Sequence, residues 1–577
     1  MSDVLNKASL ILIPSGYKQS KLYSQIPENG SGDLTFSRAS TATRVNSEGL
    51  IEKARTNFLL QSNTFDTTWS LSNGTLTGGQ TGYDGSTDAW QFDASGTAQV
   101  SQSVSTSGVQ TYSIYAKAGT ENGIFLRANG GNNPRCFFNL DSGTIGIEAG
   151  GLIDSNIEDI GNGWYRCSIV YSDTTNQPKI YVADNSNGFP STGNILIQDA
   201  QLENGLVATD YIETTTAAVS VGITADIPRL DYTNSSCPAL LLEPQRTNII
   251  KQSEYFIGSN WNNFAGITPI TNSLISPEGV ENASTLECSG NSVYRYQFTA
   301  TSSTDYVGSI FVKAKETTND FGIQTLESGT AYTSVFDIEN GIVISEGANH
   351  TSLIEDYGNG WYRCIVKFNS GTSTSNIFDL KGSQTSTKKD FYAYGAMLEA
   401  GSYASSYIPT YGASVTRGAD ASSDNDLVNT PISFGSNDDF TLFYEGSFND
   451  LSSTSNMIMG GGRQQLGASY KNYWWIQNAT SMRITGDAEV LMASASISLT
   501  DNTNHKLLVK RDGSTIDFFV DGSKLTTTQS TPNTAFVFRS LGWSYTNAVY
   551  KVSGDIKQAI VFNQALTDDE CIQLTTL

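Results

Sequence analysis

Five aromatic residues in the carboxyl-terminal part of the chain have the types and spacing that binding a sugar ring requires. Tyr473, Trp474 and Trp475 are consecutive, and Trp543 and Tyr545 follow later in the same region. Flat aromatic rings stack on the apolar faces of pyranose sugars, while amide and carboxylate groups take up the hydroxyls. Because successive strand residues point to opposite faces, at most one tryptophan of the adjacent pair belongs to a core. The other is expected at the surface, where a ligand and a partner subunit are equally open interpretations.

Acidic turns are candidates for binding Ca²⁺, which prefers hard oxygen ligands. The residues concerned are Asp84 and Asp88, then Glu278 at the place equivalent to Asp84 in a repeat described below, and the cluster Asn437, Asp438 and Asp439. The simpler alternative is that acidic turns arise by chance in a chain with 57 carboxylates. Calcium is therefore the one cofactor that the sequence suggests.

Catalytic patterns are weak, so we expect no enzyme. The chain has only two histidines, His350 and His505, and no Gly-x-Ser-x-Gly elbow lies near a predicted turn from strand to helix. No phosphate-cradling loop of the Walker type occurs either. A glycosidase needs only two suitably spaced carboxylates, which one sequence does not exclude.

Short strands must position these side chains. Runs such as 112–118, 164–171 and 194–202 alternate apolar with polar residues and end at Gly, Asn, Asp or Pro, as half-buried strands do. In the last part of the chain, Asp512 and Gly513 predict a hairpin turn. Thr567, with a glutamate three residues later, predicts a capped helix that ends near Leu574. Many short strands at this spacing favour an all-β protein built from two-sheet sandwiches.

One domain is duplicated. Residues 51–214 and 240–410 share an ordered series of landmarks, of which the longest is Gly-Asn-Gly-Trp-Tyr-Arg-Cys at 161–167 and again at 358–364. A repeat of this length is the size of a whole domain, so each copy should have its own core. The repeated Trp164 and Trp361 are interpreted mainly as structural, because large aromatics in a sandwich usually pack its core or seal its edge.

Composition limits the partners. The chain of 577 residues has 34 basic and 57 acidic side chains, so its net charge is −23. That charge disfavours binding to nucleic acid and to anionic membranes. The six cysteines form no metal-like cluster and are interpreted mostly as buried apolar residues. The one early apolar stretch is too short for a signal peptide or a membrane span, so we expect that the protein is made and assembled in a cytoplasm.

Several strings resemble a modular family of bacteriophage virion proteins that form tail fibres, tail spikes and capsid appendages. They are FSRASTATRVNSEGLIE (36–52), PRLDYTNSSCPALLLEPQRTN (228–248), GNGWYR in both copies, AMLEAGSYASSYIPTYGASVTRGAD (396–420), FFVDG (518–522) and SGDIKQAIVF (553–562). The resemblance implies tandem jelly rolls similar to carbohydrate-binding modules, followed by a sandwich of the concanavalin A or laminin G type. The first copy lacks the proline that the second has at Pro409, which leaves open whether both copies bind ligand.

On this resemblance the chain divides into five parts. They are an attachment segment (1–50), a first jelly roll (51–214), a connector (215–239), a second jelly roll (240–417) and a lectin-like sandwich (418–577). The resemblance further implies a non-enzymatic protein on the virion surface that is anchored to other virion proteins through its amino-terminal segment. It implies adhesion to host-surface polysaccharide and a homo-oligomer, for which a trimer is common in fibres. The alternatives are a purely structural tail or capsid decoration protein and a polysaccharide-degrading spike.

Overall fold

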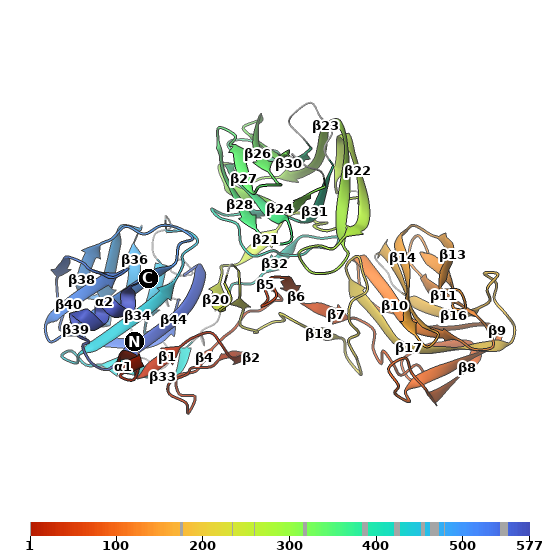
Figure 1. Ribbon diagram of the computed structural model, residues 1–577, viewed down its shortest axis with the longest axis horizontal. Coiled ribbons are helices and arrows are strands. Elements are labelled where there is room, and N and C mark those ends of the chain that lie inside the picture. Colours follow the sequence, from red (N-terminus) through yellow and green to blue (C-terminus); the bar gives the residue numbers. More distant parts are fainter. Residues whose placement is uncertain are drawn as a thin grey trace.

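The computed structural model of the chain has three β-rich lobes around a central junction (Figure 1). It describes residues 2–576 except 174–176, 234, 259, 316–319, 383–389, 421–426, 452–455, 462–471, 478 and 543–551. The helices of these residues are α1 (Ser2–Leu5), α2 (Asp568–Thr575) and the 3-10 helix η1 (Asp487–Glu489). None of them is long and apolar enough to cross a membrane. The predicted all-β class, tandem jelly-roll sandwiches followed by a concanavalin A-like sandwich, is confirmed.

The first module is a sandwich in which one long strand joins both layers. Hydrogen bonding runs in the order β13-β12-β11-β16-β9-β17-β10-β15-β14, with β8 beside β9. One end of β9 pairs with β16 and the other with β17, and buried apolar side chains fill the space between the layers. The strands are β8 (Ser70–Gln80), β9 (Ala89–Ser101), β10 (Gly108–Ala118), β11 (Gly123–Ala128), β12 (Arg135–Asn139), β13 (Thr144–Ala149), β14 (Leu152–Gly161), β15 (Trp164–Asp173), β16 (Pro178–Ala183) and β17 (Gly193–Asn204).

The second module repeats this topology strand for strand, in the order β27-β26-β25-β30-β23-β31-β24-β29-β28 with β22 beside β23. The register agrees as well, because a bulge follows Ser113 in one copy and Ser309 in the other. The repeat therefore gives a residue-by-residue correspondence between the modules. The strands are β22 (Asn262–Leu274), β23 (Ala283–Thr299), β24 (Asp305–Ala314), β25 (Asp320–Glu327), β26 (Thr330–Asp337), β27 (Ile342–Ser345), β28 (His350–Asp356), β29 (Trp361–Asn369), β30 (Ser375–Lys381) and β31 (Phe391–Ala400).

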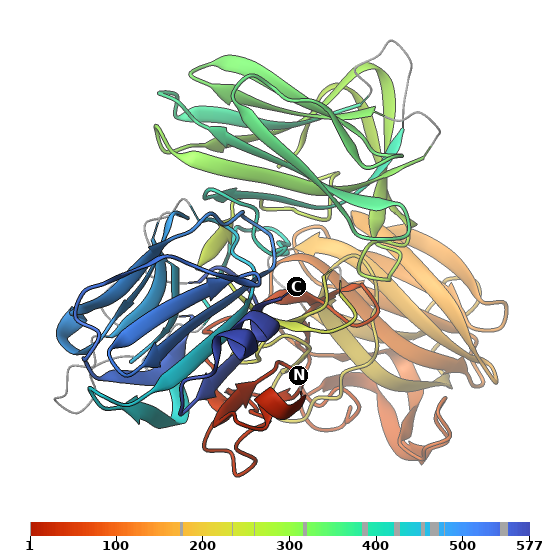
Figure 2. The ribbon, with the colours of Figure 1, turned by 60° about the vertical axis from the view of Figure 1, so that its left-hand side comes forward.

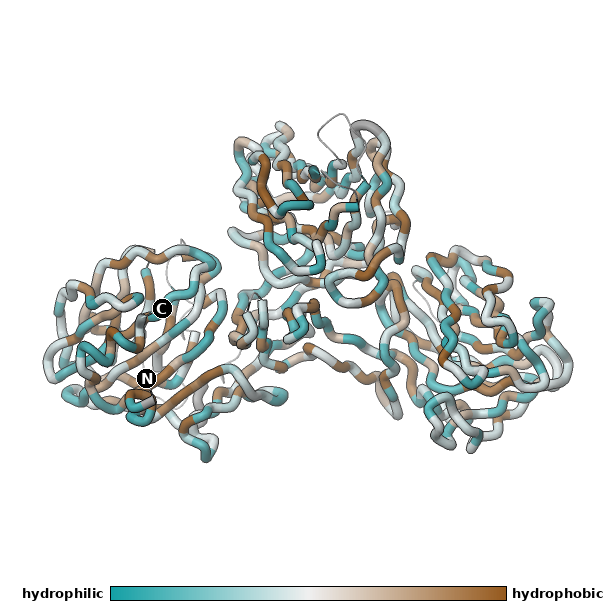
Figure 3. The backbone as a smooth tube through the Cα atoms, in the orientation of Figure 1, coloured by the Kyte–Doolittle hydropathy of each residue, from teal (hydrophilic) through white to brown (hydrophobic). Residues whose placement is uncertain are grey.

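The third lobe packs two sheets on a separate core. One sheet has the order β19-β20-β44-β34-β39-β40-β41, and the other β2-β3-β4-β33-β43-β35-β36-β37-β38-β42. Hydrophobic and hydrophilic residues alternate along many strands, as expected when one face is buried (Figure 3). The strands are β33 (Leu427–Phe434), β34 (Phe440–Gly446), β35 (Asn456–Gly460), β36 (Tyr473–Gln477), β37 (Ser481–Thr485), β38 (Leu491–Ser496), β39 (His505–Asp512), β40 (Thr515–Val520), β41 (Ser523–Lys524), β42 (Thr527–Gln529), β43 (Phe536–Leu541) and β44 (Gly554–Phe562).

The amino-terminal segment belongs to the third lobe, which differs from the separate attachment element expected at 1–50. Its strand β1 (Leu10–Leu12) pairs with β44, and β2 (Tyr17–Lys18), β3 (Lys21–Leu22) and β4 (Leu34–Thr35) extend the sheet of β33. Both chain ends therefore lie at this lobe (Figure 2). Sheet edges present unpaired backbone groups, and these distant strands cover them.

Short ribbons at the junction precede and follow each module. The hairpin of β5 (Thr43–Val45) and β6 (Ile51–Lys53) comes before the first module, and that of β19 (Leu230–Asp231) and β20 (Ala239–Leu242) before the second. Each module then opens on a strand that pairs with the one after its exit: β7 (Arg55–Asn57) with β18 (Val219–Val221), and β21 (Arg246–Asn248) with β32 (Val415–Arg417). Thus β19 of the expected connector (215–239) and the first residues of the expected second jelly roll (240–417) join a sheet of the third lobe, because β19 pairs with β20 and β20 pairs with β44.

The predictions of a hairpin at Gly513 and of a capped helix at Thr567 are confirmed. Gly513 lies at the turn between β39 and β40, and Thr567 caps α2 in a reciprocal capping box with Glu570. Trp164 and Trp361 are each 2% exposed, which fits their structural interpretation. Of the six cysteines, all but Cys237 are buried.

Candidate functional site

The prediction that Trp474 belongs to an exposed aromatic platform is wrong. Its side chain is fully buried in the core of the third lobe, because alternation along β36 turns it inward together with Ile476. The neighbouring Trp475 and Tyr473 lie on the opposite face, are half-buried, and have ring centroids 6.2 Å apart. Their role in ligand contact stays a prediction. Trp543 and Tyr545 lie outside the described residues.

A different aromatic cluster covers one outer face of the first module. Phe125 on β11, Phe137 on β12 and Tyr181 on β16 are cross-strand neighbours whose side chains point away from the core. The ring of Phe189, from the loop after β16, lies 5.2–5.5 Å from all three ring centroids. Phe189 is itself 41% exposed, so this cluster, here called the aromatic face, presents a ring to solvent. The sequence did carry a signal, since Phe125, Phe137 and Tyr181 make both faces of their strands apolar.

Two basic side chains extend the aromatic face. Arg127 and Lys179 are opposite each other on β11 and β16, two pairs further along the strands from Phe125 and Tyr181 and therefore on the same face. Arg127 Nη2 donates to Asn133 Oδ1 at 2.9 Å, and Lys179 Nζ to Gln99 Oε1 at 3.3 Å. Burial, and then the nearby Arg127 charge, lower the pKa of Lys179. The two cations thus lie side by side with neutral amides as their hydrogen-bond partners, an arrangement that an anionic group would relieve.

The second module has lost this face. Register places Gly322, Val335 and Lys381 where the first module has Phe125, Phe137 and Tyr181. At the place of Lys179 stands Asp379, which pairs with Arg295 at 2.8 Å. An internal ion pair therefore replaces the rings and the unneutralised cations, and the two copies are not chemically equivalent here.

One predicted calcium ligand is already bound to protein cations. The carboxylate of Glu278 pairs with Lys53 Nζ at 2.9 Å and also with Arg55, and the same ammonium lies 2.8 Å from Glu254 Oε1. Calcium binding at Glu278 stays a prediction, and it would require Ca²⁺ to compete with the two cations that neutralise this carboxylate. Its neighbour Tyr394 completes the pocket by donating to Glu278 Oε2 at 2.9 Å.

The equivalent pocket of the first module contains carboxylates without such a lysine. Gln198, at the place of Tyr394, donates to Asp88 Oδ1 at 2.8 Å and to Asp84 Oδ1 at 3.4 Å. Next to it, burial and the charges of Asp88 and Asp84 raise the pKa of Asp199 to about 7, although a hydrogen bond from Tyr83 opposes this. This donor set of carboxylate and amide oxygens suits Ca²⁺. Within the described ranges, however, no three acidic, histidine or cysteine side chains are grouped closely enough to hold a metal.

The third predicted acidic cluster forms an exposed turn at residues 437–439. Asp438 Oδ2 accepts from the Gly435 amide at 2.7 Å, and Asp439 Oδ1 accepts from the Gly513 amide at 2.8 Å. Both carboxylates thus brace the local backbone, as turn aspartates do. Asn437 is exposed beside them. Calcium binding at Asn437, Asp438 and Asp439 stays a prediction.

The junction between the lobes is held by buried ion pairs. Asp420 receives Arg38, with Nη1 at 3.0 Å, and Arg229, while Glu243 receives Arg229 and Arg417, each with Nη1 at 2.8 Å. Although burial opposes it, the charges of Arg417 and Arg229 lower the pKa of Glu243 to about 2. These five residues, here called the ionic junction, connect segments before, between and after the two modules. They fix the relative placement of the lobes.

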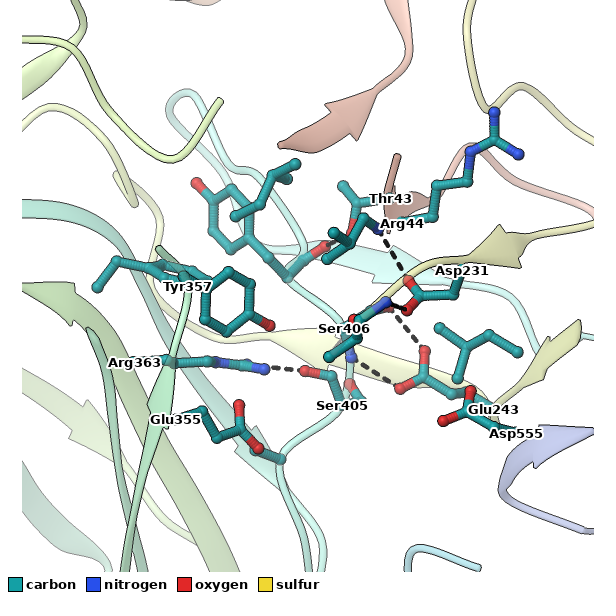
Figure 4. Close-up of a pocket in the computed structure, with 17 residues that line it drawn as sticks. Thr43, Arg44, Asp231, Glu243, Glu355, Tyr357, Arg363, Ser405, Ser406 and Asp555 are labelled. Carbon is teal, nitrogen blue, oxygen red and sulfur yellow. Dashed lines mark hydrogen bonds between the residues drawn. The ribbon is translucent and has the colours of Figure 1, made fainter. Parts of the chain in front are cut away.

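A small cavity of about 120 Å³ lies beside the ionic junction, where the second module meets both hairpins (Figure 4). Arg363 of the repeated motif and Glu355 line its module side, and Glu243 and Asp555 its other side. Glu243 accepts from the Ser406 amide and hydroxyl, at 2.7 Å each. The cavity is lined in part by structural ion pairs and has room for only a few waters.

Comparisons with known proteins show folds only. No protein-family model and no curated protein matches the chain. Among solved structures, the Ruminococcus gnavus IT-sialidase CBM40 bound to α2,3-sialyllactose is 16% identical over 24% of this chain and 84% of that one, with a TM-score of 0.21. The CBM22-1–CBM22-2 tandem domain of Paenibacillus barcinonensis Xyn10C is 10% identical over 60% and 98%, with a TM-score of 0.20. Mouse laminin α1 domains LG4-5 are 9% identical over 47% and 90%, with a TM-score of 0.16. At such values the likeness carries no argument about ligands.

Proposed function

We propose that the chain is a non-enzymatic surface component of a bacteriophage particle, a fibre or appendage, that binds host-surface glycans through the aromatic face of its first module. The observation that carries the binding proposal is the exposed Phe189 ring next to Arg127 and Lys179. A pyranose ring can stack on the phenyl group while its acidic substituent meets the two cations. The expected ligand is therefore an acidic glycan.

The proposed phage origin rests on the strings of the sequence that resemble virion proteins. Calcium binding, a homo-oligomeric state and anchoring to other virion proteins are part of the same proposal. A weak site is useful on such a particle, because many copies act together and avidity exceeds the affinity of one site. The ionic junction supports this role, since rigidly placed lobes present the aromatic face in a fixed orientation.

The test is binding of the full chain to an array of neutral and acidic host-surface glycans. Phe189→Ala and Arg127→Ala should each weaken binding by about tenfold, the loss expected for a stacking contact or a charged hydrogen bond. Gln324→Ala, at the equivalent position to Arg127 in the second module, is the matched control and should bind like the unmodified chain. Absence of glycan binding, or binding that survives both substitutions, would favour the purely structural alternative. Release of reducing ends from the polysaccharide would instead favour a degrading spike.

A further inference from the structure

A large cleft lies on the first module at the place where the second module has only the cavity of about 120 Å³. Two adjoining cavities of about 510 and 760 Å³ share the lining residues Glu158, Arg166, Ala208 and Val280. The cleft lies between β14 and β15 of the first module, the β6 and β18 ribbons, and the loop that follows β22 in the second module. Its size is that of a site for a sizeable ligand or a protein loop.

The register identifies the counterpart of this cleft. Glu158 is opposite Arg166 on β14 and β15, just as Glu355 is opposite Arg363 on β28 and β29. Both arginines donate through Nη2 to a main-chain oxygen two residues before a tyrosine that the copies share, Arg166 to Thr209 and Arg363 to Ser405. The open cleft and the cavity of about 120 Å³ shown in Figure 4 are therefore the same surface of the two copies.

Arginines close this surface in the second module. The guanidinium groups of Arg229 and Arg417 each donate through Nη1 to the Ser406 hydroxyl at 2.7 Å. Each also lies 2.8 Å from Glu243. The two arginines and Glu243 are nearly or fully buried. In the second module, guanidinium groups that bind a carboxylate and a serine hydroxyl thus occupy the equivalent site.

The first module supplies neither arginine. Val221, opposite Arg55 in its ribbon, holds the position that Arg417 has opposite Arg246, and it is 45% exposed. Arg38, which lies as far before the shared Arg-Thr-Asn as Arg229 does, pairs with Asp420 and does not line the cleft. The space that two guanidinium groups fill in one copy is thus left open in the other.

The charges around the cleft favour a cation. Asp210 replaces Ser406 directly before the tyrosine, and further carboxylates come from Glu213 and Glu158 together with Asp154 and Glu281. The basic residues Lys53 and Arg55 on the lining are both paired with Glu278. Arg166 on the lining is 8% exposed, and among the described residues its Nε has no hydrogen-bond partner, which is also true of the equivalent Arg363.

We propose that this cleft is a docking site for an arginine-bearing segment of another protein chain, which enters the space that Arg229 and Arg417 take in the second module. The guanidinium group meets the carboxylates of Asp210 and Glu213 on the cleft lining. This docking does not depend on the aromatic face, which lies on other strands of the module.

The test measures protection of a cysteine placed in the cleft. Val221→Cys is made in the full chain together with Cys237→Ser, which removes the one exposed native thiol. The rate of alkylation by N-ethylmaleimide is measured in the presence of a glycine peptide that contains two arginines. It is measured again with the same peptide in which citrulline, which has the same shape without charge, replaces both arginines. At about 2 mM arginine peptide and a Kd near 1 mM, the rate should fall about threefold, and the citrulline peptide should have no effect. Val415→Cys, on the equivalent ribbon of the second module, is the matched control and should not be protected.

The double substitution Asp210→Asn with Glu213→Gln should abolish the protection, while leaving the melting temperature unchanged because both side chains are exposed. Equal slowing by both peptides, or no slowing by either, would overturn the proposal. Protection that rises with protein concentration alone would also overturn it, because the occupant would then be a second copy of this chain.

Discussion

Lys53 and Glu254 form an ion pair with Nζ and Oε1 2.8 Å apart, although the two residues are separated by 201 positions in the sequence. Both side chains are almost fully buried, at 2% and 1% exposure. The pair fastens the segment ahead of the first module to the second module. Its two partners come from different parts of the chain, so it reports on how firmly the lobes are joined.

Lys53→Met should therefore destabilise the junction strongly. Removing one partner of a buried ion pair leaves an uncompensated charge and costs about 3–5 kcal/mol. The melting temperature of the full chain, followed by calorimetry, measures the effect. Lys18→Met, at an exposed position of β2, is the control and should melt like the unmodified chain. Equal melting of both variants would mean that the pair contributes nothing to joining the lobes.

Asp555 should make the protein less stable as the pH rises. Burial, and then the charges of Asp231 and Glu243, raise the pKa of Asp555 to about 7. Because the charged form is disfavoured in the folded state, stability falls between the ordinary aspartate pKa and about pH 7. Asp555→Asn should then stabilise the chain at pH 8, by at most about 4 kcal/mol, and have little effect at pH 4. Melting curves of this variant and of the exposed control Asp487→Asn across that range measure the difference. A stabilisation that does not depend on pH would contradict the assignment.

The two adjacent tryptophans of β36 should behave in opposite ways. Trp474→Ala removes a fully buried ring and should cost about 3–5 kcal/mol. Trp475→Ala removes a half-buried ring on the other face and should cost much less. Thermal unfolding of the third lobe separates the two effects. If Trp475→Ala instead weakens glycan binding without changing stability, the outer face of β36 is a second ligand surface.

Calcium should stabilise the first module if its carboxylate pocket binds the ion. At a Ca²⁺ concentration 100 times the Kd, the gain is about 2.7 kcal/mol, and a chelator should remove it. Asp88→Asn should abolish the effect, whereas Glu278→Gln should keep it, because that carboxylate binds Lys53 and Arg55. Melting curves with calcium and with chelator decide the question. An unchanged melting temperature in both would show that the pocket binds no calcium.

Local features of the fold could be predicted because their causes are local. The hairpin at Gly513 and the cap at Thr567 depend on residues that are neighbours in the sequence. The aromatic face was within reach too, since Phe125 and Tyr181 make their strands apolar on both sides, which a half-buried strand does not need. Which tryptophan of the pair at 474 and 475 points inward depends on the placement of the whole sheet, and the pattern alone left it open.

The junction could not be predicted in the same way. Nothing near Lys53 reveals that Glu254 is its partner, and Asp420 contacts Arg38 across the whole length of two modules. Only the folded duplication shows that the position of Arg417 is taken by Val221 in the other copy. The comparison that reveals the cleft therefore needs coordinates.

The pairing of Leu10 with Val561 also sets an order of events during synthesis. Because β1 is synthesised long before β44, its leucines stay uncovered until β44 has been made. An unfinished chain that lacks β44 therefore exposes an unpaired apolar strand. Pairing between β1 and β44 thus couples the closure of the third lobe to the late synthesis of β44.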